Sequence, residues 1–206
     1  MPDRRSLLLE KAEQLFAESG FEGTSVRNLA SAAGVNVAMI SYYFGSKEKL
    51  FEALVEYRTS FLREKTSSLN STAADPWQRL EAIVSLHVDR FFAAPLFHRI
   101  LYREASLNSR LELQRIISDA LLFHVHDLRR TLQDGMERGF FREIDVDLTI
   151  VSINGTIAQL TGASPMMYQR LLGQTSAEGN TGLQFRERLI NHLLSMLSAH
   201  ISLQKG

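Results

Sequence analysis

Apolar residues recur at intervals of three and four along most of this 206-residue chain. That spacing collects side chains on one face of an α-helix, whereas a half-buried strand requires strict alternation. Glycines, prolines and capping residues stand between these segments, where helices begin and end. We therefore predict an all-α fold without strands or internal repeats. The predicted helices span approximately residues 4–19, 26–33, 37–44, 47–69, 76–93, 96–105, 109–139, 147–163 and 183–203.

The most informative stretch runs from Thr24 to Leu50 and predicts two short helices joined by a tight turn. Ser25, or Thr24 in its place, can cap the first helix by accepting a backbone N–H. Gly34 can adopt the left-handed conformation that ends a helix, and Asn36 is a good cap for the second helix. Two helices around a glycine-containing turn are typical of a helix-turn-helix DNA reader.

The second short helix has distinct inner and outer faces. Ile40 and Phe44 lie one turn apart, so we expect them in the core. Val37, Ala38 and Tyr42 are left to face outward. The N-terminal helix supplies the third wall of this core, since two short helices cannot bury one alone. Such helices also occur as plain structural corners, so spacing by itself leaves both interpretations open.

Charge complicates a DNA-binding interpretation, because nucleic-acid binders usually carry a basic surface. The chain has 23 basic and 23 acidic residues, for a formal net charge of zero. Any positive surface must therefore come from the placement of charges, and tight binding would need two copies acting together. The first fifty residues contain as many acids as bases, namely Arg4, Arg5, Lys11, Arg27, Lys47 and Lys49 against Asp3, Glu10, Glu13, Glu18, Glu22 and Glu48.

Several classes of protein are disfavoured by composition. The chain has no cysteine, which excludes disulfides and cysteine-based sites and suits a reducing cytoplasm. No apolar run approaches the roughly eighteen residues of a membrane span. Glu10 and Lys11 interrupt the N-terminal apolar patch too early for a signal peptide. We expect a soluble, cytoplasmic protein without a membrane partner.

Catalytic motifs are missing as well. The sequence has no glycine-rich phosphate loop, no zincin histidine pair and no nucleophile elbow. His124 and His126 would diverge by about 200° on a helix, so they cannot chelate one metal together. We expect no enzyme activity, no cofactor and no metal site.

A family resemblance covers the region from Gly20 to Phe51, which reads GFEGTSVRNLASAAGVNVAMISYYFGSKEKLF. It resembles the DNA-binding region of the tetracycline-repressor (TetR) family of bacterial transcriptional regulators. The match includes the Gly-aromatic pair, the capping Thr-Ser, the Ala-Gly-Val turn, the Tyr-Tyr-Phe helix end and the following Ser-Lys-Glu. Beyond this region the match is only architectural. The resemblance implies a helix-turn-helix domain at residues 1–46 and a helical domain for ligand binding and dimerisation at 47–206.

The resemblance also implies which residues contact DNA. The second helix of the motif would enter the major groove, while helix ends beside it grip phosphate. That helix has no Arg, Lys or Gln for bidentate base contacts, so Asn36 is the best hydrogen-bonding candidate and Val37 and Ala38 suit a thymine methyl. For Tyr43, core packing is the alternative. The full set is Thr24, Ser25, Arg27, Asn36, Val37, Ala38, Met39, Ser41, Tyr42, Tyr43 and Lys47.

Two further surfaces are implied after residue 47. Family members bind a small effector among these helices, and drug-sized sites are mostly apolar. Ordinary core packing is the alternative for each candidate. The candidates are Trp77, His87, Phe91, Phe97, Phe123, His126, Asn154 and Met166.

A homodimer would form through the helices near 147–163 and 183–203, as an isologous four-helix interface. The first is rich in small residues, which favours close helix packing, and the apolar face of the second is unusually wide. The candidates are Val151, Gly155, Ala158, Gly162, Leu189, Leu193 and Leu197.

Together these features predict a homodimeric, ligand-responsive transcriptional repressor. It would bind a near-palindromic operator on double-stranded DNA and respond to a small apolar or aromatic effector. The alternative is a helical dimeric ligand-binding or protein-interaction module that has lost operator binding. The neutral charge of the N-terminal region and the small number of side chains able to hydrogen-bond bases favour that alternative. The intact caps, the turn and Lys47 oppose it.

Overall fold

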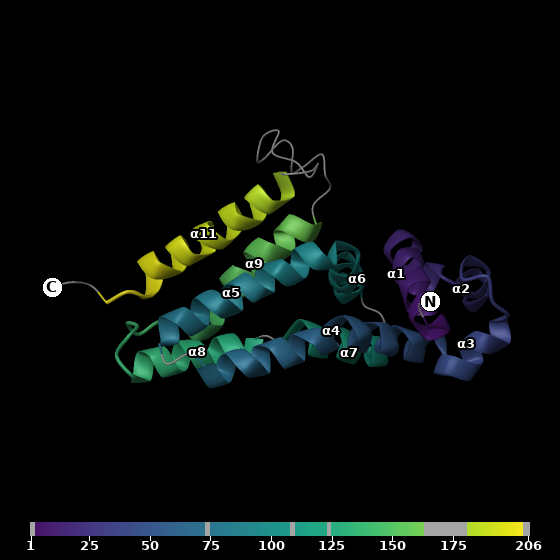
Figure 1. Cartoon of the computed structure of the whole chain (residues 1–206), viewed down its shortest axis with the longest axis horizontal. Coiled ribbons are helices and arrows are strands. Elements are labelled where there is room, and N and C mark those ends of the chain that lie inside the picture. Colours follow the sequence, from purple (N-terminus) through teal and green to yellow (C-terminus); the bar gives the residue numbers. More distant parts are fainter. Residues whose placement is uncertain (1–2, 73–74, 108–109, 123–124, 163–180, 204–206) are drawn as a thin grey trace. The chain divides into compact units, whose positions relative to one another are not determined.

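The computed structural model of the protein describes residues 3–72, 75–107, 110–122, 125–162 and 181–203, with the backbone alone at 61–72, 161–162 and 181–182. Within these ranges every regular element is an α-helix and no strand is present (Figure 1). The all-α fold predicted from the periodicity is confirmed. None of the described helices has the length and apolar character needed to cross a membrane.

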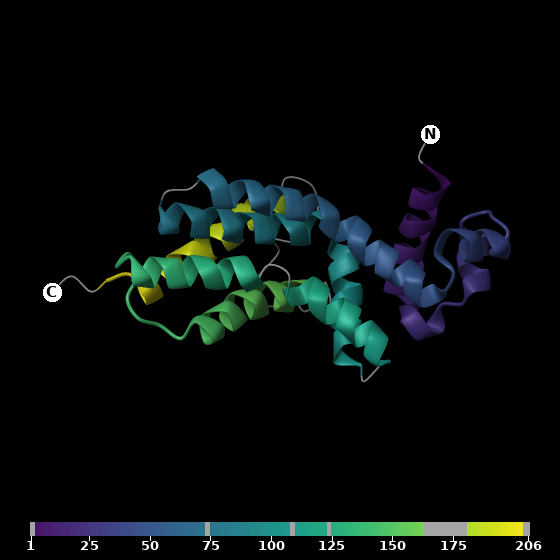
Figure 2. The ribbon, with the colours of Figure 1, turned by 90° about the horizontal axis from the view of Figure 1, so that it is seen from below.

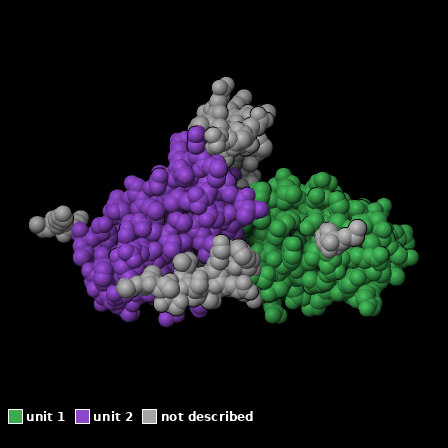
Figure 3. Space-filling view, viewed as in Figure 1, with its two compact units in different colours: residues 1–64, 94–122 green, residues 65–93, 123–206 purple. Residues whose placement is uncertain are grey.

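The chain divides into two compact units (Figure 3). Unit 1 comprises Met1–Glu64 and Ala94–Leu122, and unit 2 comprises Lys65–Ala93 and Phe123–Gly206. This division differs from a boundary at residue 46, because two helices from the middle of the chain pack with the N-terminal helices. The helix that begins at Lys47 runs from unit 1 into unit 2.

Unit 1 is built around a three-helix head at the N-terminus. The two helices of the predicted motif start and stop within one residue of the expected positions, whereas the first helix ends four residues later than expected. Figure 2 shows the three short helices grouped beside the start of the fourth. The helices of this unit are α1 (Arg4–Gly23), α2 (Val26–Ala32), α3 (Val37–Phe44), the first part of α4 (Lys47–Thr72), α6 (Pro95–Ser106) and α7 (Leu111–Leu122).

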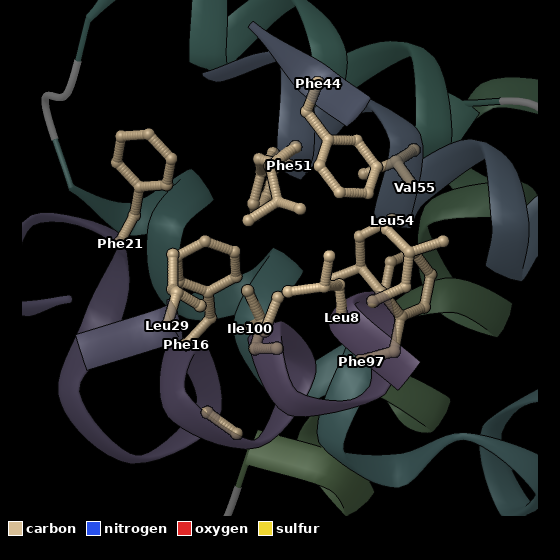
Figure 4. Packing of buried hydrophobic residues seen from close by; sticks show 14 of the residues in the cluster. Leu8, Phe16, Phe21, Leu29, Phe44, Phe51, Leu54, Val55, Phe97 and Ile100 are labelled. Atoms are coloured by element: carbon tan, nitrogen blue, oxygen red, sulfur yellow. The ribbon is translucent and has the colours of Figure 1, made fainter. Parts of the chain in front are cut away.

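An aromatic cluster lies at the centre of unit 1 (Figure 4). The rings of Phe16, Phe21 and Phe51 have centroids 5.5–5.7 Å apart, and all three side chains are fully buried. Phe97 of α6 belongs to the same core, with 1% of its surface exposed. Its ring therefore packs in the core of unit 1, which is the alternative that the sequence left open for each effector candidate.

Charged side chains of α6 fix the end of α1. Gly20 interrupts the regular turns of α1 with a φ of 81°, which leaves backbone groups there without helical partners. The buried carboxylate of Glu104 accepts the N–H of Phe21 at 3.1 Å, and Arg103 donates to the carbonyl of Ala17 at 3.1 Å. These contacts make α6 part of the framework that holds the head.

Unit 2 is a separate helical bundle. Its central helix, α5, packs against α8, α9 and α11, and buried apolar side chains come from all four helices. The predicted cap of α5 is present, since the carboxylate of Asp75 accepts the N–H of Trp77 at 2.9 Å. The helices are α5 (Pro76–Ala93), α8 (Val125–Glu137), α9 (Val146–Gly162) and α11 (Thr181–Ile201).

One predicted helix is wrong. The segment 109–139 was expected as a single long helix, whereas the structure has α7 in unit 1 and α8 in unit 2. Buried positions recur through both helices at helical spacing, and no glycine or proline lies between Leu113 and Thr131. The apolar periodicity indicates which face of each helix is buried. It does not indicate that α7 and α8 are buried in the cores of different units.

Candidate nucleic-acid interface

Caps and one glycine shape the helix-turn-helix locally. The hydroxyl of Ser25 accepts the N–H of Asn28 at 3.1 Å, so Ser25 is the cap of α2. Gly34 has a φ of +64°, which reverses the chain between the helices. The side-chain oxygen of Asn36 accepts the N–H of Ala38 at 2.9 Å and caps α3. The predicted capping residues and turn are confirmed.

Thr24 has a structural role rather than an exposed one. Its side chain is buried, and its hydroxyl lies 2.7 Å from the carbonyl oxygen of Gly20 and 3.2 Å from that of Leu15. The hydroxyl therefore ties the loop before α2 back to α1. Of the two candidates for a phosphate contact at this helix end, only Ser25 has an exposed side chain.

The outer face of α3 combines aliphatic and tyrosyl side chains. Ile40 and Phe44 are buried as predicted, which leaves Ala38 and Ser41 exposed on the opposite side. Val37 is 40% exposed and Tyr42 is 81% exposed.

Tyr43 and Met39, in contrast, are half-buried. The ring of Tyr43 contacts both neighbouring aromatics, with centroids 5.3 Å from Tyr42 and 6.1 Å from Phe44. Tyr43 thus packs partly against the core and also contacts the exposed ring of Tyr42.

Lys47 links the start of α4 to the end of α1. Its ammonium donates to the carbonyl oxygens of Phe21 at 2.8 Å and Thr24 at 3.1 Å. The same nitrogen lies 4.2 Å from the centre of the Phe21 ring, close enough for a cation–π contact. An ammonium group has three donors, so one remains for an anion at this surface.

Arginines from outside the first fifty residues neutralise acids of the head. Arg110 of α7 pairs with Glu48 at 2.6 Å and with Glu22 at 3.4 Å, and Arg58 of α4 pairs with the buried Glu13. The cations Arg5 and Arg27, in contrast, are exposed. Placement of charge, rather than excess of charge, therefore shapes the electrostatics of the head, as the sequence led us to expect.

The pKa of Glu48 is lowered below its ordinary value. The largest cause is a hydrogen bond from its own backbone N–H, which favours the ionised carboxylate and outweighs the opposing effect of burial. The hydroxyl of Ser46 and the charges of Arg110 and Lys47 act in the same direction. This carboxylate therefore stabilises the start of α4 only while it is ionised.

Of the predicted effector residues that the structure describes, two lie in direct ring contact. His87 and Phe91 lie one turn apart on α5 with ring centroids 5.2 Å apart, and both are buried. Trp77 packs edge-on against Phe141 at 6.2 Å. Among the other candidates, His126 is exposed and Asn154 of α9 is half-buried. Phe123 and Met166 lie outside the described residues.

The predicted dimer residues divide between surface and core. Leu189, Leu193 and Leu197 on α11 are buried inside unit 2, which leaves little of their surface for a second subunit. They are part of the wide apolar face of α11 and pack on the subunit's own core. Val151 and Gly155 on α9 are exposed, and Ala158 is half-buried. At Gly162 only the backbone is described.

An open groove of about 340 Å³ lies between α9 and α11. Its walls combine aliphatic side chains with a carboxylate, hydroxyls and an imidazole. The lining residues are Asp145, Leu148, Thr149, Ser152, Met196, Leu197 and His200. No group of three or more histidine, aspartate or glutamate side chains arranged to hold a metal occurs among the residues that the structure describes.

Sequence reasoning missed the residues that hold the head in place. Arg103 and Glu104 lie more than eighty positions from their partners in α1. Local periodicity cannot reveal such pairs, because it reports the buried face of a helix and not its neighbour. The adjacent Arg and Glu, next to the apolar positions of α6, were the only signal in the sequence.

Comparison with known proteins identifies the same region as a DNA-binding domain. The family of bacterial regulatory proteins, tetR family, matches residues 8–54, from α1 into the start of α4. The HTH-type transcriptional repressor NicS of Pseudomonas putida is 32% identical over 150 residues, which cover 70% of this chain and 68% of NicS.

Solved structures agree over nearly the whole chain. The ketosteroid transcriptional regulator KstR2 of Mycobacterium tuberculosis has a TM-score of 0.72 at 23% identity, covering 99% of this chain and 97% of that one. AibR, in complex with isovaleryl coenzyme A and operator DNA, has a TM-score of 0.71 at 20% identity, with coverage of 94% and 97%. These two structures show the shared fold, and the NicS match extends beyond the head into both units. The chain belongs to the tetR family of bacterial regulatory proteins.

Proposed function

We propose that the protein is a transcriptional repressor that binds a near-palindromic operator as a homodimer and releases it when a small apolar or aromatic effector binds. The exposed face of α3 carries this proposal. Its side chains are held outward by two buried anchors, Ile40 and Phe44, and by the cap at Asn36. A helix presented in this way fits the major groove.

Charge explains why two heads are needed. Among the described residues of the head, the cations available to phosphate are few, namely the exposed Arg4, Arg5 and Arg27 and the remaining donor of the half-buried Lys47. Each phosphate contact adds affinity that weakens with salt, so one head of this composition would bind duplex DNA weakly. Two heads on half-sites about 34–36 Å apart would multiply their affinities.

The exposed face of α9 supports a homodimer. Leu148 is 65% exposed and Val151 is 63% exposed, although both are aliphatic. Gly155 lies on the same face, and a Cβ atom added there would meet nothing within 4 Å. Glycine inside a helix costs about 1 kcal/mol relative to alanine, so close approach of a second copy gives this residue a role.

The exposed side of α11 flanks the same surface. Met196 and His200 are exposed and line the groove with Leu148, whereas Leu189 and Leu193 are buried and do not line it. We infer that this exposed side, rather than Leu189, Leu193 and Leu197, joins α9 in an isologous four-helix interface.

Effector binding would act through unit 2. An effector with different affinities for two conformations shifts the population toward the one it prefers. The helix α4 belongs to both units, so we infer that it transmits this shift to the head. In the conformation that the effector prefers, the distance between the two heads would no longer fit successive major grooves. The protein would then release the operator.

Selection of bound sequences from a random duplex pool at low salt tests the proposal. The purified full chain should enrich an inverted repeat. Ala38→Glu, which places a carboxylate on the outer face of α3, should enrich nothing while keeping its thermal melting and its oligomeric state. Ser118→Glu, at an exposed position of α7, is the matched control and should select the same repeat as the parent.

A folded dimer that enriches no duplex would contradict operator binding, provided that unfolding and refolding to remove a co-purified ligand gives the same result. Such a protein would instead be a helical dimeric module that has lost operator binding. The neutral charge of the head and the absence of Arg, Lys and Gln from α3 are the observations that favour this second candidate.

A further inference from the structure

The outer face of α3 offers methyl groups and little hydrogen-bonding capacity. Residues four apart share a helical face, so Val37 aligns with Ser41 and Ala38 with Tyr42. Val37 and Ala38 lie nearest the N-terminus of α3, and both are aliphatic and exposed. This end of a recognition helix contacts the base edges. Only the hydroxyls of Ser41 and Tyr42 are polar on this face.

The side chain of Asn36 is engaged in the cap of α3. Recognition of adenine by an asparagine uses its oxygen and its nitrogen together, as acceptor and donor. The oxygen of Asn36 already accepts the N–H of Ala38 at 2.9 Å, which holds the amide group against the start of α3 rather than presenting both of its atoms to a base edge. Guanine is usually read by Arg or Lys, and α3 has neither. Hydrogen bonds from this helix would therefore discriminate poorly among bases.

We propose, on the basis of the proposed function, that α3 reads its operator chiefly through the 5-methyl groups of thymine, with Val37 and Ala38 as the contacts. Thymine is the only standard base with a methyl group in the major groove, and aliphatic side chains contact it. Burial of the methyl group against Val37 removes apolar surface from water on both partners. The half-site therefore carries A·T pairs where the N-terminus of α3 meets the groove.

Tyr42 has a different role on this face. Its exposed ring is supported edge-on by Tyr43, with ring centroids 5.3 Å apart. A hydroxyl held at the end of a supported ring suits a phosphate oxygen, which fixes the register of the helix without reading sequence. Sequence discrimination then rests on Val37 and Ala38.

Base analogues test this directly on the selected operator. Replacing thymine by uracil removes the methyl group and keeps the base pair. Each thymine contacted by α3 should lose affinity by about three- to fivefold when replaced, as expected for one buried methyl group. A cytosine introduced at the same position should bind weakly, and 5-methylcytosine should recover about three- to fivefold of that loss, because it restores the methyl group alone.

Protein variants identify the contact. In Val37→Ala, the uracil penalty at one thymine of each half-site should fall to less than twofold, while the other penalties stay unchanged. Coupling of this kind between a side chain and a base methyl group indicates direct contact. Ser41→Ala is the matched control on the same helix face and should leave every uracil penalty as it is in the parent.

The possible failures are distinguishable. If no duplex is enriched by the refolded protein, the proposed function fails and this inference with it. If an inverted repeat is enriched but uracil costs less than twofold at every position, the thymine readout alone is overturned. The thymine readout is also overturned if guanine is enriched opposite α3 and 7-deazaguanine, which lacks the acceptor N7, weakens binding there.

Discussion

The helices α3 and α9 both expose apolar side chains, but the two exposed faces differ in chemistry. On α3 the exposed apolar residues stand beside hydroxyls, in a short helix capped at its start and anchored by two buried aromatic or aliphatic residues. On α9 the exposed residues are aliphatic and are followed along the same face by a glycine. The first face suits a wet, polar groove, whereas the second suits another helix.

This difference indicates how one chain can separate DNA contact from self-association. Nucleic-acid interfaces are polar and hydrated, so a surface that contacts DNA can leave tyrosine and serine side chains exposed to solvent. A subunit interface excludes water, and a glycine lets two backbones approach closely. Substitutions on α3 should therefore change DNA binding alone, and substitutions on α9 should change dimerisation first and DNA binding as a consequence.

The largest effect is expected from Gly155→Arg. A long, charged side chain on the exposed face of α9 should prevent close approach of a second copy and give a monomer in sedimentation equilibrium. Operator affinity should then fall at least about 100-fold, because the two heads would no longer be linked. Gln133→Arg, at an exposed position of α8, is the matched control and should remain dimeric. A dimeric Gly155→Arg protein would show that α9 is not the interface.

Next in size is Tyr42→Ala. Loss of an exposed ring and its hydroxyl should weaken operator binding by about tenfold, or about 1.4 kcal/mol. Fluorescence anisotropy with a labelled operator measures this, and sedimentation should show an unchanged dimer. Leu111→Ala removes another highly exposed apolar side chain of unit 1 and should leave affinity as it was. If Tyr42→Ala altered dimerisation instead, the separation of the two faces would fail.

The head was predictable from sequence because its signals are local. The caps at Ser25 and Asn36, the glycine turn and the buried pair on α3 each depend on neighbours within a few residues. The packing partners of the apolar helix faces in unit 2 were less predictable. The sequence marked α11 as apolar over half its circumference but could not show that Leu193 faces its own subunit, since partners of a helix face are set by tertiary packing.

The same limit applies to single polar atoms. Asn36 was the best hydrogen-bonding candidate in sequence, yet its oxygen is engaged in the cap. Glu104 was marked only by its place beside Arg103 and the apolar positions of α6, and nothing in the sequence showed that its buried carboxylate accepts a backbone N–H at the break in α1. Several local and distant partners can compete for one side chain, and the three-dimensional arrangement decides which of them it contacts.

Lys47→Ala tests whether the edge of the reading face contacts phosphate. The third donor of the ammonium is free to bind an anion, so removal should weaken binding similarly on all duplexes and lower the salt slope by about one unit. Loss of the two hydrogen bonds to Phe21 and Thr24 should also lower the melting temperature.

Lys47→Met separates these effects, because its stem can still pack over the Phe21 ring while the charge is absent. Both variants should share the reduced slope in titrations at several salt concentrations. An unchanged slope in both would remove Lys47 from the phosphate contacts and leave it a purely structural role.

The smallest effect concerns Glu48, behind the reading face at the start of α4. Its pKa is lowered in the folded protein, so the ionised carboxylate adds stability above its ordinary pKa, and that stability is lost as the pH falls through the lowered value. Glu48→Gln should therefore melt lower than the parent near pH 7, by an amount matching a few tenths of a kcal/mol for a partly exposed pair. In acid the two melting temperatures should converge.

Glu22→Gln is the matched control for Glu48→Gln. Glu22 also pairs with Arg110, but at 3.4 Å and with a more exposed side chain, so its replacement should change the melting temperature less. Calorimetry between pH 3 and 8 measures both variants against the parent. A difference for Glu48→Gln that widened toward acid would reverse the sign and show that ionised Glu48 opposes folding. The anchoring of α4 beside the reading face would then depend on Lys47 and the cap at Ser46.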